Sequence, residues 1–118
     1  MIHVYKEERP WGSFERFTKD VPSTVKLITV NPGHSLSLQY HEHRQEFWRI
    51  LQGDPVVTIG DKEISAELGC EFFVDKRIKH RVSAPKNTVV FLEISLGRFD
   101  ENDIVRLDDR YGRTSKKT

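Results

Sequence analysis

Residues 33–53 read GHSLSLQYHEHRQEFWRILQG, and this stretch decides the fold. Four side chains that can bind a metal fall within eight residues of it: Gln39, His41, His43 and Glu46. They lie between two short segments rich in residues that favour β-strands. A fifth such side chain, His80, follows a second strand-like segment that is introduced by Gly69. The two segments together predict a single metal site inside a small β-barrel.

The residues from Ser35 to His43 alternate in polarity. Because successive side chains of a strand point to opposite faces, the two faces can be read from the sequence. One face takes Ser35, Ser37, Gln39, His41 and His43, and the other takes Leu36, Leu38 and Tyr40. Alternation alone favours a strand whose polar face meets solvent. The spacing of the ligand-type residues favours the opposite interpretation, in which the polar face points inward.

The length of 118 residues predicts a single domain, with N-terminal strands over 1–20, a barrel core over 21–96 and a C-terminal arm over 97–118. Nineteen basic and 18 acidic residues give a net charge of +1, which argues against nucleic acid as a partner. The single cysteine, Cys70, excludes an internal disulfide framework and suits a reducing cytoplasm. No apolar run approaches the roughly 18 residues of a membrane span, and the first residues do not resemble a signal peptide.

Short apolar runs bounded by Gly, Pro, Asn or Asp predict an all-β protein. The candidate strands are 12–18, 25–30, 35–40, 46–51, 56–59, 63–65, 71–74, 80–83 and 89–95. Gly60-Asp61 predicts a tight hairpin between two of them. The segment 99–107 can form either a helical turn or an extended arm, and Tyr111 suggests that the end of the chain docks on the domain. We expect Trp11 to be buried and to close one end of the barrel.

Two glycine-led motifs in these segments resemble those of the cupin family. The first consists of Gly33, Gln39, His41, Glu46 and Gly53, with Gln39 where the family has histidine. The second runs from Gly69 to His80. The resemblance implies a cupin fold, which is a double-stranded β-helix or jelly-roll barrel.

A closer resemblance is to the cupin domain of type II mannose-6-phosphate isomerases, a domain usually fused behind a mannose-1-phosphate guanylyltransferase. The segments that carry it are 9–15, 38–48, 79–82 and 103–113. No glycine-rich nucleotidyltransferase signature precedes them, so the chain resembles the isomerase domain standing alone. The resemblance implies interconversion of mannose 6-phosphate and fructose 6-phosphate, a role in polysaccharide biosynthesis and a separate guanylyltransferase as a candidate partner.

The expected metal ligands are Gln39, His41, Glu46 and His80. One amide oxygen, two imidazoles and one carboxylate suit a divalent ion, zinc first, with manganese, iron, cobalt or nickel as alternatives. Because no thiolate is present, a closed structural zinc site is not expected. His43 can replace Gln39 as a ligand, contact substrate or be solvated.

Aldose–ketose isomerisation needs a base beside the carbonyl and a metal that stabilises the enediolate. The residues predicted to act in catalysis are Glu93, Lys79 and Arg113, and those predicted to bind the sugar phosphate are His43, Arg44, Lys26 and Arg81. Glu93 lies in an apolar run, so it is either paired with a basic side chain or poised as a base with a raised pKa.

Two other interpretations remain open from the sequence. A metal-poor cupin could bind a sugar or sugar phosphate without turning it over, since Gln39 replaces a histidine. A cupin dioxygenase is a third class, and no residue points to it. A homodimer is also predicted, in which the N-terminal strand Ile2–Lys6 pairs across a two-fold axis.

Overall fold

The computed structural model describes residues 2–109, 111 and 112. Every regular element in these residues is a β-strand, which confirms the all-β prediction. The strands are β1 Tyr5–Arg9, β2 Gly12–Arg16, β3 Ser23–Val30, β4 Leu38–Tyr40, β5 Arg44–Gln52, β6 Val56–Ile59, β7 Lys62–Ser65, β8 Glu71–Val74, β9 His80–Ser83, β10 Val89–Gly97 and β11 Val105–Asp108. The described residues contain no helix long and apolar enough to cross a membrane.

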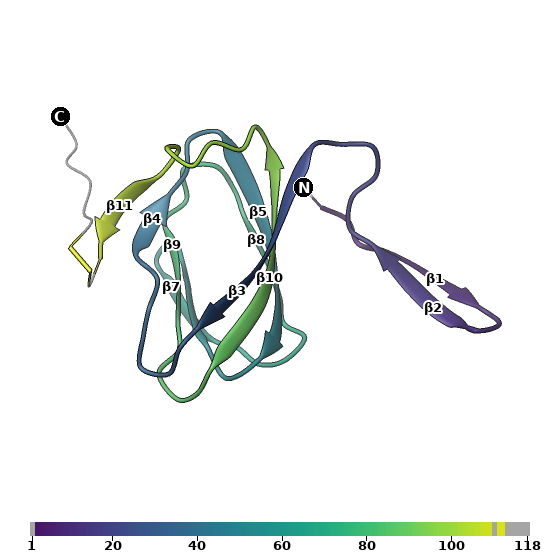
Figure 1. The fold of residues 1–118 in the computed structure, drawn as a ribbon, viewed down its shortest axis with the longest axis horizontal. Coiled ribbons are helices and arrows are strands. Elements are labelled where there is room, and N and C mark those ends of the chain that lie inside the picture. The colour runs from purple at the N-terminus through teal and green to yellow at the C-terminus, as the bar shows by residue number, and fades with distance from the viewer. Residues whose placement is uncertain (1, 110, 113–118) are drawn as a thin grey trace.

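Two antiparallel sheets form the barrel and face each other across its core (Figure 1). One has the strand order β3-β10-β5-β8, and the other has the order β11-β4-β9-β6-β7. The long strands β5 and β10 pair along most of their length, with Phe91 opposite Ile50 and Glu93 opposite Trp48. The buried apolar core includes Trp48, Ile50, Val57, Val82 and Phe91. Alternation along each strand places these side chains inside, and one end of the same interior is polar.

The strands joined by short turns agree best with the sequence prediction. Strands β6, β8 and β9 have the predicted bounds, and the turn at Gly60 joins β6 to β7 as a hairpin. The expected strand 35–40 is shorter, because only Leu38–Tyr40 is regular and Ser35 forms an isolated bridge to Ser83. In the segment 99–107 the extended alternative is correct, since it leads into β11.

Tyr111, which follows β11, contacts the barrel at His34. The ring of Tyr111 stacks on His34 at a centroid distance of 6.1 Å, and the Tyr111 hydroxyl lies 2.6 Å from His34 Nδ1. This contact confirms the docking that Tyr111 suggests in the sequence.

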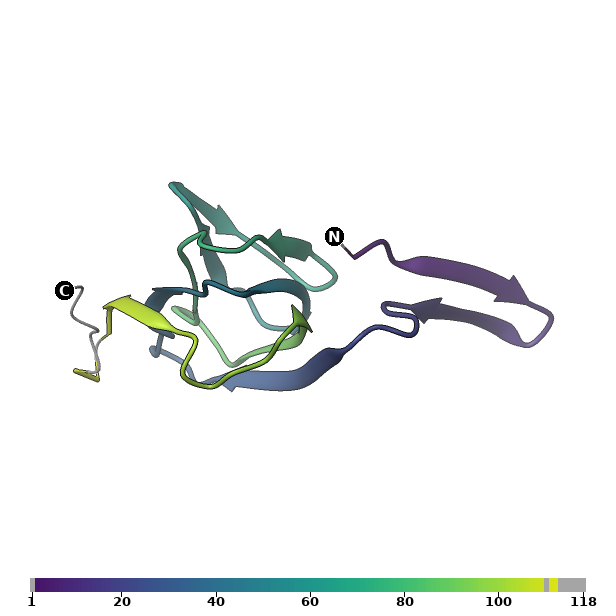
Figure 2. The same cartoon turned by 90° about the horizontal axis from the view of Figure 1, so that it is seen from above.

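Strands β1 and β2 form a hairpin that projects away from the barrel (Figures 1 and 2). Trp11 lies in the turn of this hairpin and is 73% exposed, so the expectation that it closes the barrel is wrong. The tryptophan buried in the barrel is Trp48 of β5, which packs against Phe91. The error arises because burial of an aromatic residue depends on where its turn points, and a local pattern does not give that direction.

Candidate metal centre

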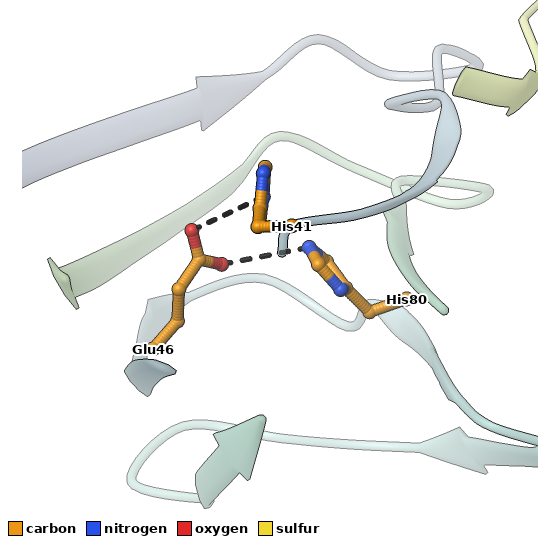
Figure 3. Close-up of side chains that lie close together, drawn as sticks. All are labelled: His41, Glu46 and His80. Carbon is orange, nitrogen blue, oxygen red and sulfur yellow. Dashed lines mark ion pairs between the residues drawn. The ribbon is translucent and has the colours of Figure 1, made fainter. Parts of the chain in front are cut away.

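Three buried side chains from separate parts of the barrel converge at its polar end (Figure 3). His41 follows β4, Glu46 lies on β5 and His80 begins β9. The Nε2 atom of His41 lies 3.4 Å from Glu46 Oε2, and the Nε2 atom of His80 lies 3.5 Å from Glu46 Oε1. The three ligand atoms all lie within 4.8 Å of one another, which is close enough to share one metal ion.

Backbone carbonyls fix the orientation of both imidazole rings. His41 Nδ1 lies 2.6 Å from the carbonyl oxygen of Asp103, and His80 Nδ1 lies 2.9 Å from that of Ile78. Because a carbonyl can only accept, each Nδ1 carries the hydrogen and each Nε2 presents its lone pair toward Glu46. Histidine ligands of metal ions are held in this way by their other ring nitrogen.

The neutral form of the two histidines, which burial favours, is the form that binds a metal cation. Burial lowers the pKa of His41 and of His80, although the charge of Glu46 opposes the shift in both. The neutral form therefore dominates at neutral pH, and neutral imidazole is the form that binds metals. His80 Nε2 is fully buried and makes no hydrogen bond within the described part of the chain. A buried polar atom of this kind calls for an unseen partner, and a metal ion would supply one.

Glu46 is held by two further side chains. Trp48 Nε1 donates to Glu46 Oε1 and Arg44 Nε donates to Glu46 Oε2, both at 3.2 Å. The guanidinium of Arg44 also donates to His41 Nε2 at 3.2 Å. Arg44 therefore occupies the lone pair of His41 that a metal would use. Metal binding would require Arg44 to withdraw from His41 while it keeps or shifts its contact with Glu46.

Gln39 shares the inner face with this group. It is the register partner of His80 across β4 and β9, so the two side chains point to the same side of the sheet. Its Oε1 accepts a hydrogen bond from Ser37 Oγ at 2.9 Å. Among the described residues, no hydrogen bond joins the Gln39 side chain to the side chain of Glu46 or of either histidine. Its role as a fourth ligand stays a prediction.

Asp103 anchors the site from outside the strands that carry the ligands. Besides its carbonyl contact to His41, its carboxylate accepts the backbone N–H groups of Glu42 at 2.8 Å and His43 at 3.0 Å. Burial works to raise the pKa of Asp103, but these two N–H groups together lower it. The sequence reasoning missed this role, because the contact spans about 60 residues of chain. The signal that was present is the family-like segment 103–113, which begins at this residue.

Glu93 is a buried carboxyl group with a raised pKa, which is the property expected of a catalytic base. It lies on β10 between its cross-strand partners Lys26 and Trp48 and faces the barrel interior. Burial first and the charge of Glu46 second raise the pKa of Glu93 against the opposing charges of Lys26 and Arg44, and the net pKa is about 7. No ion pair to Glu93 occurs among the residues that the structure describes. The role of Glu93 as a base stays a prediction.

Lys26 and Arg44, two residues predicted to bind substrate, both lie against the ring of Phe99. Lys26 Nζ and Arg44 Cζ each lie 4.7 Å from the centre of the Phe99 ring. Arg44 also donates to the carbonyl of Asp100 at 3.3 Å, and Lys26 lies 3.8 Å from Glu101. The connection between β10 and β11 thus places two cations beside the buried carboxylates.

The structure does not place the other predicted site residues that it describes in contact with the His41–Glu46–His80 group. Arg81 pairs with Asp108 at 3.3 Å and lies on the outer face, because it follows the inward-pointing His80 on the same strand. Its role in binding substrate stays a prediction. Lys79 is directed to Asp61 at 3.1 Å, and His43 is exposed. Arg113 lies outside the described residues.

Comparison with known proteins gives a family and a fold. The family described as mannose-6-phosphate isomerase C-terminal matches residues 2–109. A xanthan biosynthesis protein, XanB, of Xanthomonas campestris is 38% identical over 111 residues, which cover 92% of this chain and 24% of that protein. The mannose-1-phosphate guanylyltransferase ManC of Salmonella typhimurium is 36% identical over 115 residues, which cover 94% of this chain and 24% of that protein. The chain thus spans about a quarter of the length of these curated relatives.

A solved structure of a cupin protein from Bacteroides fragilis shows the same fold. Its TM-score is 0.60 at 19% identity, and the match covers 81% of this chain and 72% of that one. At this identity the likeness concerns the fold alone. It confirms that the barrel is a cupin.

Proposed function

The chain belongs to the mannose-6-phosphate isomerase C-terminal family, and on that premise we propose that it is a metal-dependent isomerase of mannose 6-phosphate and fructose 6-phosphate. The observation that carries the proposal is the buried His41–Glu46–His80 group, with its two imidazole lone pairs turned toward one carboxylate. A structural role alone would not explain why His80 Nε2 is buried without a hydrogen-bond partner among the described residues.

The donor set fits a divalent metal. His41, Glu46 and His80 would hold the ion, with Gln39 proposed as a fourth ligand. The set contains no thiolate and only one carboxylate, so zinc is our first choice and manganese, iron, cobalt and nickel are the alternatives. When bound, such an ion would stabilise negative charge that develops on a sugar oxygen.

Glu93 is proposed to move the proton. Isomerisation takes a proton from C2 of the aldose and returns one to C1 of the ketose, while a hydroxyl proton passes from O2 to O1. A carboxylate with a pKa of about 7 can accept a proton and give it back near neutral pH. Its position beside Glu46 and Arg44 puts this group next to the proposed metal ligands.

Phosphate binding is assigned to the cations at Phe99. Arg44 and Lys26 lie against this ring at the polar end of the barrel, and arginine suits phosphate because it can donate two parallel hydrogen bonds. Arg44 would then have two tasks, since it also holds Glu46. His43 and Arg81 are proposed as further substrate-binding residues, and Lys79 and Arg113 are proposed to act in catalysis.

Names of the relatives suggest where the reaction belongs. Because the matched relatives include a mannose-1-phosphate guanylyltransferase and a xanthan biosynthesis protein, we assign this chain to sugar-phosphate supply for polysaccharide biosynthesis. A guanylyltransferase would be its functional partner, and the cytoplasm its compartment.

A second candidate function is sugar-phosphate binding without turnover. The contact of Arg44 with His41 Nε2 favours it, because a guanidinium can satisfy this nitrogen in place of a metal. The Gln39 oxygen is likewise engaged by Ser37. In this alternative the same cations hold the phosphate and no proton moves.

An enzyme-linked assay of the purified, chelator-treated chain with each metal added back decides between the two functions. We expect isomerase activity with at least one metal and a loss of about 100-fold or more in kcat for Glu93→Gln. Glu63→Gln, at an exposed carboxyl on β7, is the matched control and should keep full activity. Absence of turnover with every metal, together with binding of mannose 6-phosphate by calorimetry, would establish the non-catalytic alternative instead.

A further inference from the structure

The Arg44 side chain lies between the candidate metal group and the connection from β10 to β11. Its Nε donates to Glu46 Oε2 and one terminal nitrogen donates to His41 Nε2, each at 3.2 Å. The other terminal nitrogen donates to the carbonyl oxygen of Asp100 at 3.3 Å, and the centre of the Phe99 ring lies 4.7 Å from the guanidinium carbon. The side chain is only 8% exposed. A single buried cation thus contacts both the group that would hold a metal and the segment that follows β10.

The contact with His41 uses the lone pair that a metal ion would need. His41 Nδ1 donates its hydrogen to the carbonyl oxygen of Asp103, so Nε2 has one lone pair to offer. That lone pair binds either a guanidinium N–H or a metal ion. A guanidinium keeps its positive charge at every working pH, and two cations at one buried nitrogen repel each other. Arg44 must therefore leave His41 when a metal ion binds there.

The contacts outside the group give Arg44 a place to stay after it leaves His41. The Asp100 carbonyl and the Phe99 ring hold the outer side of the guanidinium. Lys26 Nζ lies 4.7 Å from the centre of the same ring. The nitrogen that turns away from His41 then has a free N–H beside a second cation. Arginine N–H groups bind phosphate oxygens strongly, because these hydrogen bonds are charge-assisted.

The balance of charge in the group changes in the same direction. In the present arrangement the positive charge of Arg44 is paired with the negative charge of Glu46. A divalent ion would add two positive charges to this buried group, and uncompensated buried charge is unfavourable. A phosphate monoester carries about 1.5 to 2 negative charges at pH 7. A sugar phosphate bound beside Arg44 would therefore offset the charge of the ion, and each ligand would favour the other.

We propose that Arg44 couples the two ligands: it competes with the metal ion for His41, and once released it binds the phosphate of the sugar. The proposal rests on the proposed function, because it takes the metal and the phosphate to the same end of the barrel. The ion and the sugar phosphate then each tighten the binding of the other by the same factor. An Arg44 that only positioned Glu46 would act in the opposite sense, since its loss would weaken metal binding.

Competition between the chelator-treated full chain and a fluorescent zinc chelator tests the first half of the proposal. We expect Arg44→Met to bind zinc about 10-fold or more tightly than the wild type, because a charged hydrogen bond no longer competes for His41. Lys26→Met is the matched control. It removes a cation at the same distance from the Phe99 ring, but its hydrogen bonds and ion pairs among the described residues do not include the metal group. Its zinc affinity should stay unchanged.

Arg44→Lys guards against a folding defect in Arg44→Met. Lysine keeps a positive charge for Glu46, but it lacks the planar fork that reaches Glu46, His41 and Asp100 together. This variant should also bind zinc more tightly than the wild type, although by less than Arg44→Met. The near-ultraviolet signal of buried Trp48 reports the fold of each chain.

Calorimetry with mannose 6-phosphate, with and without zinc, tests the second half. In the wild type we expect zinc to tighten mannose 6-phosphate binding by about 10-fold or more. In Arg44→Met the gain should be clearly smaller, because only direct contact of the sugar with the ion remains. Equal gains in the two chains would overturn the coupling.

The outcomes separate this proposal from the proposed function. Zinc that binds both Arg44 variants no more tightly than the wild type overturns the coupling and leaves the metal centre standing. An equal gain in zinc affinity for Lys26→Met also overturns it, because loss of charge alone would then explain the result. Absence of zinc from every chain would overturn the metal centre and the coupling together. Both binding effects without turnover would support the coupling and contradict only the isomerase.

Discussion

At the scale of single residues, the site is a set of buried polar groups whose contacts define the role of each. His41 and His80 are oriented by carbonyls, Glu46 is fixed by Trp48 and Arg44, and Glu93 lies on the neighbouring strand β10. Burial stabilises the neutral forms of the histidines and of Glu93. A cation would change this balance, because Glu46 and Arg44 now carry the only charges in direct contact with His41 Nε2 among the described residues.

Glu93 gives a dependence of stability on pH in metal-free protein. Its folded pKa of about 7 lies above the ordinary value of 4.5, so between these values the folded state binds a proton that the unfolded state releases. The free energy of unfolding should therefore fall as pH rises from 4.5 to 7, and the penalty should be complete above pH 7. The shift corresponds to about 3 kcal/mol.

Glu93→Gln should remove this penalty, because a neutral amide replaces the buried carboxylate. Urea unfolding in the presence of a chelator, measured from pH 4 to 8, should show the variant gaining stability on the wild type as pH rises. Glu63→Gln, at an exposed position, should follow the wild-type curve. Parallel curves for wild type and Glu93→Gln would show that Glu93 does not titrate in this range.

The sequence predicted the three residues that converge, but not all of their surroundings. His41, Glu46 and His80 were found because ligand spacing within a strand and after a glycine is a local property. The outward direction of Arg81 could not be predicted, because only the burial of His80 shows which face of β9 points inward. Asp103 was missed because its contacts to Glu42 and His43 join distant parts of the chain.

At the scale of elements, the connection between β10 and β11 acts as a strap over the polar end of the barrel. It supplies Phe99 and the Asp100 carbonyl to Arg44, and Asp103 to the turn that carries His41. The strap therefore positions His41, a proposed ligand, and supplies none of the three residues of the His41–Glu46–His80 group. If the group binds a metal as proposed, the residues of the strap should influence its affinity.

Asp103→Ala removes both carboxylate contacts to the 42–43 backbone and should loosen His41. We expect metal affinity to fall by about 10-fold or more, the range seen when groups that orient ligands are lost. Asp108→Asn, which alters the exposed partner of Arg81 on β11, should leave the affinity unchanged. Competition with a fluorescent zinc chelator measures both variants. Equal affinity for Asp103→Ala and wild type would show that the strap does not position His41.

The glycine that ends the first motif is required by its element. Gly53 has a φ of +90°, and a Cβ there would meet the carbonyl oxygen of Thr88 at 2.3 Å. Gly69 has nearly the same φ, +89°, but its Cβ would meet no atom within 4 Å. Gly69→Ala should therefore lower the free energy of unfolding through backbone strain alone, by on the order of 1 kcal/mol. Gly53→Ala should cost clearly more, because the β5–β6 turn must also move; equal unfolding midpoints in urea would contradict the argument.

Elements bounded by tight turns were predictable, and those placed by long-range contacts were not. Strands β6, β8 and β9 match their predicted bounds because glycine and proline turns mark their ends locally. The projection of the β1–β2 hairpin and the exposure of Trp11 depend on how the chain leaves β2. No periodicity in 1–20 contains that information.

At the scale of the whole molecule, the two sheets contribute different residues to the candidate site. The four-stranded sheet contributes Glu46 and Glu93 to the interior. The five-stranded sheet contributes His80, and His41 follows its strand β4. The site therefore exists only when both sheets close, since no single sheet carries all three converging ligands. Metal binding should accordingly report closure of the barrel.

Titration of chelator-treated protein with zinc, followed by elemental analysis, tests this account most directly. We expect one ion per chain in the wild type and in Arg81→Gln, whose side chain points outward, and loss of that ion in His80→Ala, with the fold of each checked by near-ultraviolet circular dichroism. Manganese, iron(II), cobalt and nickel should bind at the same group if they bind. A wild-type chain that retains none of these metals, or a His80→Ala chain that binds zinc as tightly as the wild type, would contradict the metal centre.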